Sequence, residues 1–491
     1  MLVGGREVPA AAGGTLQVLS PATGQPIGEV ACAEREDVDT AVAAAKKAFD
    51  DGVWREMPPA ERAKIMNRFA DGIERCLEDL YALESVNNGR PIRETRAQVS
   101  RVPEWYRYNA ALLLADRSDV IPLGGPYHSY TTRFPLGVVA ILSSFNHPLM
   151  IGSKGLAPAL ATGNSVVLKP SEQTPLTTLL LGDIANEVGF PPGVLNVIVG
   201  RGAVAGAALA EHLDVKKVTF TGGTEVGRAV ATAAVAHFAK VTVELGGKSP
   251  VLVFPDADLT DAVRGTAFAG FVAAGQTCIA GTRLLVHRKI HDELVDGLVA
   301  QARTLRIGDP ASPDTDLGPV ISARARDRIL DYVRIGQEEG AKVAVGGNAA
   351  TVDGLEDGFF VEPTVLVGVT NQMRVAREEI FGPVVVVIPF DTEEEAVAMA
   401  NDSPFGLGSA VWTGNVARAH RVAQRLTHGM VWVNDHHRLD PASPWGGVRD
   451  SGLGREGGWE SFHDFTEVRA VTVRIAENGV NWYGGDNDRL N

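Results

Sequence analysis

The sequence predicts an α/β protein built on two parallel sheets. From Gly137 onward, short β-branched runs alternate with helical stretches, beginning with "VVAIL", "SVVLKPS", "VKKVTFTGG" and "KVTVELGG". A second alternating series follows Cys278 and includes "RLLVH", "VVVVIPF" and "MVWVND". Alternation of strands and helices is typical of a parallel sheet covered by helices on both faces, and such sheets bind ligands beyond the carboxyl ends of their strands. The length of 491 residues fits two or three domains better than one core.

The chain before this alternation is predicted to be helical. Residues 35–115 place Ala41, Ala44, Ala45 and Ala48 at helical spacing, and "ERAKIMNRFADGIERCLEDLYALE" continues the pattern. The final "FTEVRAVTVRI" has strand character instead. Because a terminal strand with no local partner often pairs with another subunit, we expect this one to do so.

Composition and charge restrict the partners and the compartment. The formal net charge of -14 and the pI near 5.3 oppose nonspecific binding to nucleic acid. Three widely separated cysteines, Cys32, Cys76 and Cys278, predict neither a disulfide framework nor a zinc site and favour a reducing compartment. The start has no signal-peptide pattern, and no run approaches about 20 apolar residues. We expect a soluble, cytoplasmic protein that binds no nucleic acid, membrane or metal.

One of two glycine-rich stretches is compatible with nucleotide binding. "VTFTGGTEVGRAV" reads as strand, glycine turn and helix, and Gly222 and Gly223 would let the backbone approach a phosphate at the helix N-terminus. A glycine turn of this kind is equally common for packing reasons. "GLGREG" (Gly452 to Gly457) matches GxGxxG formally, but no clear strand precedes it and no βαβ unit follows, so we do not interpret it as a dinucleotide fingerprint.

Charged residues follow two of the predicted strands. Lys169 and Glu172 end "VVLKPSEQTP", where they could hold a ribose or stand in a solvated loop. Glu244 in "VELGGKSP" could act as a general base if it is buried, or could be an ordinary charge at a strand end. The residues alone leave both alternatives open.

Cys278 is the candidate nucleophile. It lies in "AAGQTCIAGTR", among small residues that leave room for a substrate, but no histidine stands nearby to deprotonate it. A small core residue is the alternative. Asn146 in "FNHPLM" could supply a polar group, and the "DHH" at Asp435 to His437 is interpreted as a solvent-facing loop rather than a metal site.

Seven motifs, taken together and in order, resemble the aldehyde dehydrogenase superfamily. The resemblance runs from "SPATGQPIGEV" (Ser20 to Val30) to "FTEVRAVTV" and covers nearly the whole chain. The motifs are "ALATGNSVVLKPSEQTP", "FTGGTEVG", "VTVELGGKSP", "GQTCIAGTR", "EEIFGPVV", "FGLGSAVWT" and "PWGGVRDSGLGREGG".

The resemblance implies catalytic and cofactor residues. It makes Cys278 the nucleophile, Glu244 the general base, and Asn146 a donor to the oxyanion hole together with the Cys278 N–H. It implies that NAD is held by Lys169 and Glu172 at the adenosine ribose, by Gly223 at the pyrophosphate, and by Glu379 and Phe381 at the nicotinamide side. NAD is expected over NADP because Glu172 would repel a 2'-phosphate. The nucleotide site of the family is a Rossmann variant without GxGxxG.

The family likeness also implies domains and an assembly. Residues 1–116 and 136–246 would form the Rossmann-like NAD-binding domain, and residues 247–446 an α/β catalytic domain. Residues 117–135 and 447–491 would form a small β oligomerisation arm with the C-terminal tail, in which "YHSYTTRF" and "FTEVRAVTV" join copies of the chain into a homodimer or homotetramer.

The implied reaction is oxidation of an aldehyde to a carboxylic acid through a cysteine thiohemiacetal and a thioester, which water hydrolyses with Glu244 as base. One alternative is the branch of the superfamily that transfers the acyl group to coenzyme A; it commonly lacks a carboxylate at the Glu244 position. Another is a catalytically silent relative with a structural or binding role, against which the intact Cys278, Asn146, Glu244 and Glu379 argue.

Departures from the family pattern fall on the predicted substrate tunnel. The chain has "SFNHP" where relatives often have "PWNFP", and Lys154 stands where many relatives have an aromatic residue. The predicted tunnel residues are His147, Met150, Lys154, His437, Leu439 and Trp445. We hypothesise that the basic groups among them, together with Arg438, favour an aldehyde with a carboxylate or another polar end.

Overall fold

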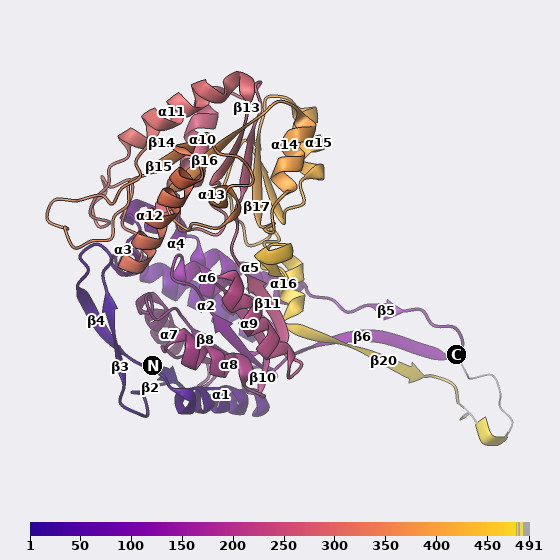
Figure 1. Cartoon of the computed structure of the whole chain (residues 1–491). Coiled ribbons are helices and arrows are strands. Elements are labelled where there is room, and N and C mark those ends of the chain that lie inside the picture. Colours follow the sequence, from indigo (N-terminus) through magenta and orange to yellow (C-terminus); the bar gives the residue numbers. More distant parts are fainter. Residues whose placement is uncertain (478, 480–481, 485–491) are drawn as a thin grey trace.

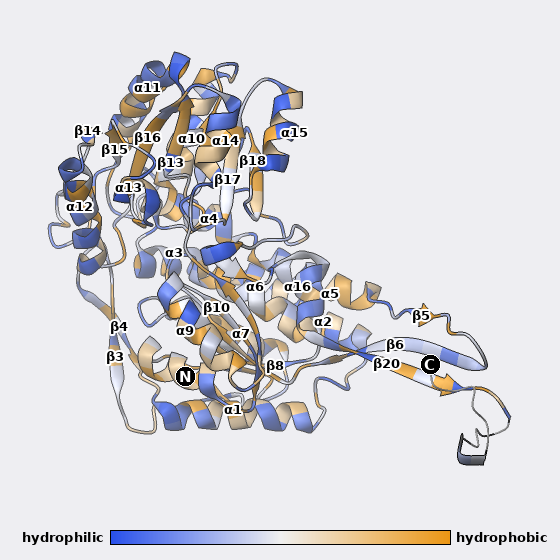
Figure 2. Ribbon diagram, turned by 45° about the vertical axis from the view of Figure 1, so that its right-hand side comes forward, coloured by the Kyte–Doolittle hydropathy of each residue, from blue (hydrophilic) through white to orange (hydrophobic). Residues whose placement is uncertain are grey.

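The computed structural model describes residues 1–477, 479 and 482–484. Two large sheets stand one above the other, each with helices against it, and a long narrow ribbon projects to one side (Figure 1). In Figure 2, β13 (Arg283–His287) and β16 (Val384–Phe390) of the upper sheet are largely hydrophobic, while α12 (Ala323–Glu338) at the surface is largely hydrophilic. The predicted α/β class with parallel sheets is confirmed.

The first sheet has eight strands in the order β19-β11-β10-β7-β8-β9-β1-β2. Its central strands β11, β10, β7, β8 and β9 are parallel, and all five residues of "VVAIL" in β7 are buried, as expected for a strand covered on both faces. The strands are β1 (Leu2–Val3), β2 (Arg6–Glu7), β7 (Val138–Leu142), β8 (Ser165–Lys169), β9 (Leu195–Val197), β10 (Val215–Thr221), β11 (Lys240–Glu244) and β19 (Gly452–Leu453).

Helices cover this sheet, and several of them form the segment 35–115 that was predicted to be helical. The segment 35–115 folds into five consecutive helices, in agreement with its periodicity. The helices are α1 (Arg35–Asp50), α2 (Pro59–Arg75), α3 (Leu77–Asn88), α4 (Ile92–Val99), α5 (Val102–Ala115), α6 (Pro148–Ala161), α7 (Leu176–Val188), α8 (Ala207–Glu211) and α9 (Thr224–Val235).

The second sheet has seven strands in the order β14-β15-β16-β13-β12-β17-β18. Its strands are β12 (Pro250–Val253), β13 (Arg283–His287), β14 (Lys342–Val345), β15 (Thr364–Val367), β16 (Val384–Phe390), β17 (Gly408–Trp412) and β18 (Met430–Val433). The helices that follow β11 in the chain are α10 (Leu259–Phe271), α11 (His291–Thr304), α12 (Ala323–Glu338), α13 (Arg374–Arg377), α14 (Glu393–Asn401), α15 (Val416–Arg425) and α16 (Gly458–Asp464).

Two smaller sheets complete the described chain. The ribbon contains β5 (Val120–Ile121), β6 (Tyr127–Pro135) and β20 (Thr466–Arg474), and a separate pair contains β3 (Thr15–Leu19) and β4 (Pro26–Ala31). Strand β20 pairs with β6 antiparallel along its whole length, from Thr466↔Pro135 to Arg474↔Tyr127. The terminal strand has no partner nearby in the sequence, as expected, and a distant segment of the same chain supplies one; its pairing with another subunit stays a prediction.

The domain boundaries stay a prediction. The strands of the four sheets fall within the predicted ranges except β19, which lies in the predicted arm segment 447–491 but pairs with β11. Residues 478, 480–481 and 485–491 of that segment lie outside the described residues. Among the residues described, none of the helices combines the length and the apolar character needed to cross a membrane.

Candidate active site

The carboxyl ends of the first sheet open into a cavity of about 540 Å³. Parallel register brings these ends together, since Thr221 pairs with Glu244 and Leu142 pairs with Lys169. Loops of the second-sheet region close the cavity from the other side. All eight residues predicted for catalysis and cofactor binding line it: Asn146, Lys169, Glu172, Gly223, Glu244, Cys278, Glu379 and Phe381.

Cys278 lies in the loop between α10 and β13 and is half-buried. Burial raises the pKa of its thiol to about 12, and the positive charge of Lys154 is the largest influence in the opposite direction. Its backbone N–H has no acceptor in the part of the chain that the structure describes. The Cys278 thiol therefore ionises only if nearby positive charge stabilises the thiolate, and the backbone N–H of the same residue is free to donate a hydrogen bond.

The Asn146 side chain is fixed beside this loop by two hydrogen bonds. Its amide Nδ2 donates to the Gln276 carbonyl at 2.8 Å, and its Oδ1 accepts from the Ser144 hydroxyl at 2.7 Å. Because Ser144 donates to the oxygen, the NH₂ group is the end that faces the Cys278 loop. Nδ2 keeps a second N–H that can donate to an oxyanion.

Glu244 ends β11 and is 3% exposed. Its two oxygens accept no hydrogen bond of ordinary geometry from the described residues, although the Gly447 N–H lies close enough to lower the pKa. Burial, and next the charge of Glu456, raise the pKa of this carboxyl well above its usual range. A buried carboxyl group without firm partners costs stability, which favours a chemical role for it.

Lys154 lies in α6 and is already paired. Its Nζ is 3.2 Å from Glu456 Oε2 and 3.9 Å from the centroid of the Trp445 ring, and both charged side chains are nearly buried. The Lys154 ammonium group is therefore not free to pair with a substrate carboxylate as it stands. The sequence patterns did not predict a role for Glu456, which belongs to the "GLGREG" stretch that we did not interpret as a nucleotide fingerprint.

The residues predicted for the adenosine ribose and the pyrophosphate lie at or just after the ends of β8 and β10, the two strands that flank β7. Lys169 Nζ is 3.6 Å from Glu172 Oε2, and Glu172 Oε1 accepts the Gly202 N–H at 3.3 Å. Gly223 precedes the first turn of α9, and a Cβ added to it would meet nothing within 4 Å. The helix N-terminus therefore presents free N–H groups to open space, which suits a phosphate.

The residues predicted for the nicotinamide side come from the loop before β16. Glu379 Oε1 accepts the Gly247 N–H at 3.0 Å, and a Cβ on Gly246 would come within 2.4 Å of Glu379 Oε2. Phe381 has φ 58° and meets Phe145 edge to face at 5.7 Å. A phenylalanine in the left-handed region at a cavity wall is strained, which is typical of functional sites.

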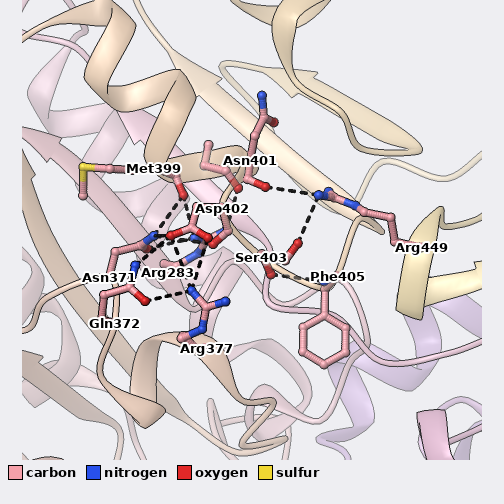
Figure 3. Close-up of polar contacts among 11 residues, drawn as sticks. Arg283, Asn371, Gln372, Arg377, Met399, Asn401, Asp402, Ser403, Phe405 and Arg449 are labelled. Carbon is pink, nitrogen blue, oxygen red and sulfur yellow. Dashed lines mark hydrogen bonds and ion pairs between the residues drawn. The ribbon is translucent and has the colours of Figure 1, made fainter.

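A polar network behind the cavity holds this loop (Figure 3). Asp402 accepts from Asn371, Gln372 and Arg377 of the segment before Glu379, at 3.2, 2.8 and 3.3 Å. Arg449 donates to the carbonyl groups of Asn401 and Ser403 at 3.1 and 3.0 Å.

Ser451, two residues after Arg449, reaches the strand end that carries Glu244. Its hydroxyl donates to the Gly246 carbonyl at 2.7 Å and accepts the Gly406 N–H at 2.9 Å. The network therefore supports both sides of the cavity, through contacts that the sequence analysis did not identify.

The predicted tunnel residues do not line the 540 Å³ cavity. Trp445 belongs to a small apolar cluster against which Cys278 and Leu439 pack. Met150 belongs to the core cluster that Leu439 also contacts. Leu439 therefore connects the surroundings of Met150 with those of the nucleophile.

The two predicted tunnel histidines are half-buried. Burial lowers the pKa of His437 to about 3 and that of His147 well below its usual range, so both rings are neutral near pH 7. His436 is 4% exposed and stacks on Trp432 at 4.8 Å. The interpretation of "DHH" as solvent-facing is wrong for His436, because the aromatic side chains around it cover the ring.

The aldehyde dehydrogenase family model matches residues 8–471. The chain belongs to this family. It is 41% identical to betaine aldehyde dehydrogenase of Bacillus subtilis over 95% of each chain, and 42% identical to mitochondrial aldehyde dehydrogenase of Equus caballus over 94% of this chain and 92% of the other. The crystal structure of PnpE from Pseudomonas sp. WBC-3 superposes with a TM-score of 0.95 at 46% identity, covering 98% of this chain and 99% of PnpE.

The predicted family, fold and enzyme class are confirmed by these matches. The chain is an oxidoreductase of the aldehyde dehydrogenase family. A further structure of PnpE was determined in complex with nicotinamide adenine dinucleotide, at 47% identity to this chain.

Proposed function

We propose that this aldehyde dehydrogenase oxidises its substrate with NAD through a covalent intermediate on Cys278. The cofactor is NAD, as in the complex of PnpE. The observation that supports the residue roles is the cavity of about 540 Å³, in which Cys278, Glu244 and Asn146 face the predicted cofactor residues. Its size, the open helix N-terminus at Gly223 and the Glu172 carboxylate fit a dinucleotide.

The first step is addition of the Cys278 sulfur to the aldehyde carbon. The carbonyl oxygen becomes an oxyanion that receives the Asn146 amide and the Cys278 N–H. One such donor is typically worth about 3 kcal/mol in a preorganised site. Lys154 favours the thiolate, since its charge opposes the effect of burial on the thiol pKa.

NAD, when bound, accepts the hydride that leaves the thiohemiacetal carbon. Lys169 and Glu172 hold the adenosine ribose, the N–H groups at Gly223 hold the pyrophosphate, and Glu379 with Phe381 holds the nicotinamide side. Glu244 then takes a proton from water, which attacks the resulting thioester and releases the carboxylic acid and free Cys278. The raised pKa of Glu244 makes it a stronger base than an exposed carboxylate.

A direct test is an assay of the purified chain with NAD and a panel of aldehydes, following NADH. Continuous NADH formation without coenzyme A supports the proposal, whereas dependence on coenzyme A supports the acylating branch. A chain that binds no NAD and forms no NADH would support the silent-relative alternative.

The same panel tests the substrate tunnel, which we propose to be lined by His147, Met150, Lys154, His437, Leu439 and Trp445. Lys154 is ion-paired and the histidines are neutral, so a neutral aldehyde should be oxidised at least as efficiently as its carboxylated homologue. A strong preference for the carboxylated aldehyde would show that Arg438 or a displaced Lys154 binds its carboxylate.

We further propose a cytoplasmic homodimer or homotetramer. Strand β20 lies at the edge of the three-stranded ribbon, and exposed apolar side chains such as Val468 and Val473 stand on it. An open strand edge with apolar side chains favours pairing with a second copy.

Replacing Lys154 should change the pH dependence of the reaction. In Lys154→Met, Cys278 and Glu244 lose a positive charge that lowers the pKa of each, so their ionised forms appear only at higher pH. The pH of half-maximal kcat/KM should rise by about 1 pH unit or more. Profiles of kcat/KM against pH for the wild type and Lys154→Met measure this.

Two variants control for loss of packing at Lys154. Lys154→Arg keeps the charge and should keep the wild-type profile. Adding Glu456→Gln to Lys154→Met should reverse part of the shift, because Glu456 raises both pKa values. An unchanged profile in Lys154→Met would contradict the electrostatic role.

Glu172 should determine the preference for NAD. The wild type should have a lower KM for NAD than for NADP, because the carboxylate repels a 2'-phosphate. Glu172→Gln keeps an oxygen that can accept from Gly202 but removes the charge, so the ratio of the two KM values should shrink by about tenfold or more. A lower KM for NADP in the wild type would contradict the assignment.

A further inference from the structure

The loop that leads to Cys278 begins with a left-handed turn. Ala273 has φ 54° and ψ 34°, Ala274 has φ 51° and ψ 36°, and Gly275 follows with φ 68°. Glycine adopts these angles freely, but alanine does so rarely and has no side-chain polar group to stabilise them. Two successive alanines in this region persist only if surrounding contacts hold them.

The contact that holds the start of this turn comes from Glu94, in the first turn of α4. Its two carboxylate oxygens accept the Ala273 N–H at 3.2 and 3.1 Å. The neighbouring Arg93 pairs with Asp316 at 2.7 Å instead, and Glu94 forms no ion pair in the described part of the chain. The carboxylate of Glu94 is therefore directed to the turn and not to a surface charge.

This left-handed turn also fixes two groups of the proposed catalytic site, the Asn146 amide and Cys278. The Ala273 carbonyl accepts from Gln276, at 3.0 Å from the backbone N–H and 3.4 Å from Nε2. The Gln276 carbonyl accepts from Asn146 Nδ2 at 2.8 Å, and Cys278 follows two residues later. A chain of direct contacts thus runs from Glu94 through Ala273 and Gln276 to the oxyanion donor and the nucleophile.

The turn has little room to rearrange. A Cβ on Gly275 would lie 2.1 Å from the Gly382 carbonyl oxygen, beside Phe381 of the cofactor cavity. Ala273 and Ala274 are 2% and 3% exposed. If the Ala273 N–H lost its acceptor, the buried donor would favour another backbone conformation, and Gln276 would move with it.

We propose that Glu94 is a positioning residue for the nucleophile loop: its carboxylate holds the left-handed turn at residues 273–275, which sets Cys278 and the Asn146 amide in place. The inference rests on the proposed function of Cys278 and Asn146. Glu94 itself does not line the 540 Å³ cavity.

The test compares Glu94→Ala, Glu94→Gln and the double variant Glu94→Ala/Ala273→Gly. Glu94→Ala should lower kcat by about 10- to 100-fold, because small misplacements of reacting groups are costly, with the KM for NAD changed less than about threefold. Glu94→Gln keeps one acceptor oxygen and should stay within about fivefold of the wild type. The double variant should have a kcat at least about fivefold higher than that of Glu94→Ala, because a glycine at position 273 adopts the turn without strain.

Glu78→Ala is the matched control. Glu78 is an exposed residue of α3 that pairs with Arg96 of α4 at 3.1 Å. Its replacement removes a carboxylate that contacts α4 but does not alter the contact with the turn. It should leave kcat unchanged. Wild-type kcat in Glu94→Ala, or equal losses in Glu94→Ala and the double variant, would overturn the inference.

Alkylation of Cys278 by iodoacetamide, followed on its peptide by mass spectrometry, gives a second readout. The dependence of the alkylation rate on pH should differ from the wild type in Glu94→Ala and should match the wild type again in the double variant. The same pH dependence in Glu94→Ala and in the wild type would count against the inference. This measurement needs no turnover. A wild type that oxidises no aldehyde would therefore contradict the proposed function while the role of Glu94 is still tested.

Discussion

Glu244→Gln should convert continuous turnover into release of about one NADH per active site, followed by a stall. Cys278 and Asn146 stay intact in this variant, so addition to the aldehyde and loss of hydride still occur. Hydrolysis of the thioester lacks its base, and steady-state kcat should fall by about 10²- to 10⁴-fold. Stopped-flow absorbance of NADH measures the burst and the stall.

A matched control removes a carboxylate elsewhere. Glu187→Gln alters an exposed glutamate that pairs with Arg75 at 3.0 Å, and it should turn over as the wild type does. Mass spectrometry of the stalled Glu244→Gln enzyme should find the acyl group on the peptide that contains Cys278. Normal turnover of Glu244→Gln without coenzyme A would show that Glu244 is not the base.

Cys278→Ala should abolish both the burst and the turnover. No covalent intermediate can form without the sulfur, so activity should fall by at least about 10⁴-fold. The affinity for NAD should change little, because the predicted cofactor contacts lie on the strand ends at Lys169 and Gly223 and in the loop at Glu379. Titration of NAD by protein fluorescence, together with the NADH assay, separates the two properties.

Cys76→Ala provides the comparison for this variant. Cys76 lies between α2 and α3, half-buried against the core and away from the cavity. Its replacement should keep full activity apart from a small loss of stability. A burst of NADH in Cys278→Ala would contradict the assignment of the nucleophile.

Local patterns predicted the elements of this fold well. Strand–helix alternation and helical spacing depend on neighbours a few residues apart, and the strands and helices at 35–115 and after Gly137 follow them. The pairing of β20 with β6 was not predicted, because the two strands are separated by more than 300 residues and pairing across such a distance leaves no local pattern.

The predicted catalytic and cofactor residues were found through motifs, not through their individual surroundings. Seen alone, Cys278, Glu244 and Lys169 were each compatible with a structural role. Parallel strands explain why motifs far apart in the chain meet, since the carboxyl ends of β7, β8, β10 and β11 share one edge.

The sequence by itself determined the α/β class, the family and the residues that line the cavity, because these follow from periodicity and from motifs that each span a few residues. Only the tertiary structure decided which charged groups around the cavity are paired, which titratable groups are neutral, and which contacts hold the strained turn. Lys154 forms an ion pair with Glu456, burial keeps His147 and His437 neutral, and Glu94 holds a turn of two alanines. Pairing, burial and backbone angles depend on which distant side chains come within a few ångströms, and residue order alone does not specify those contacts.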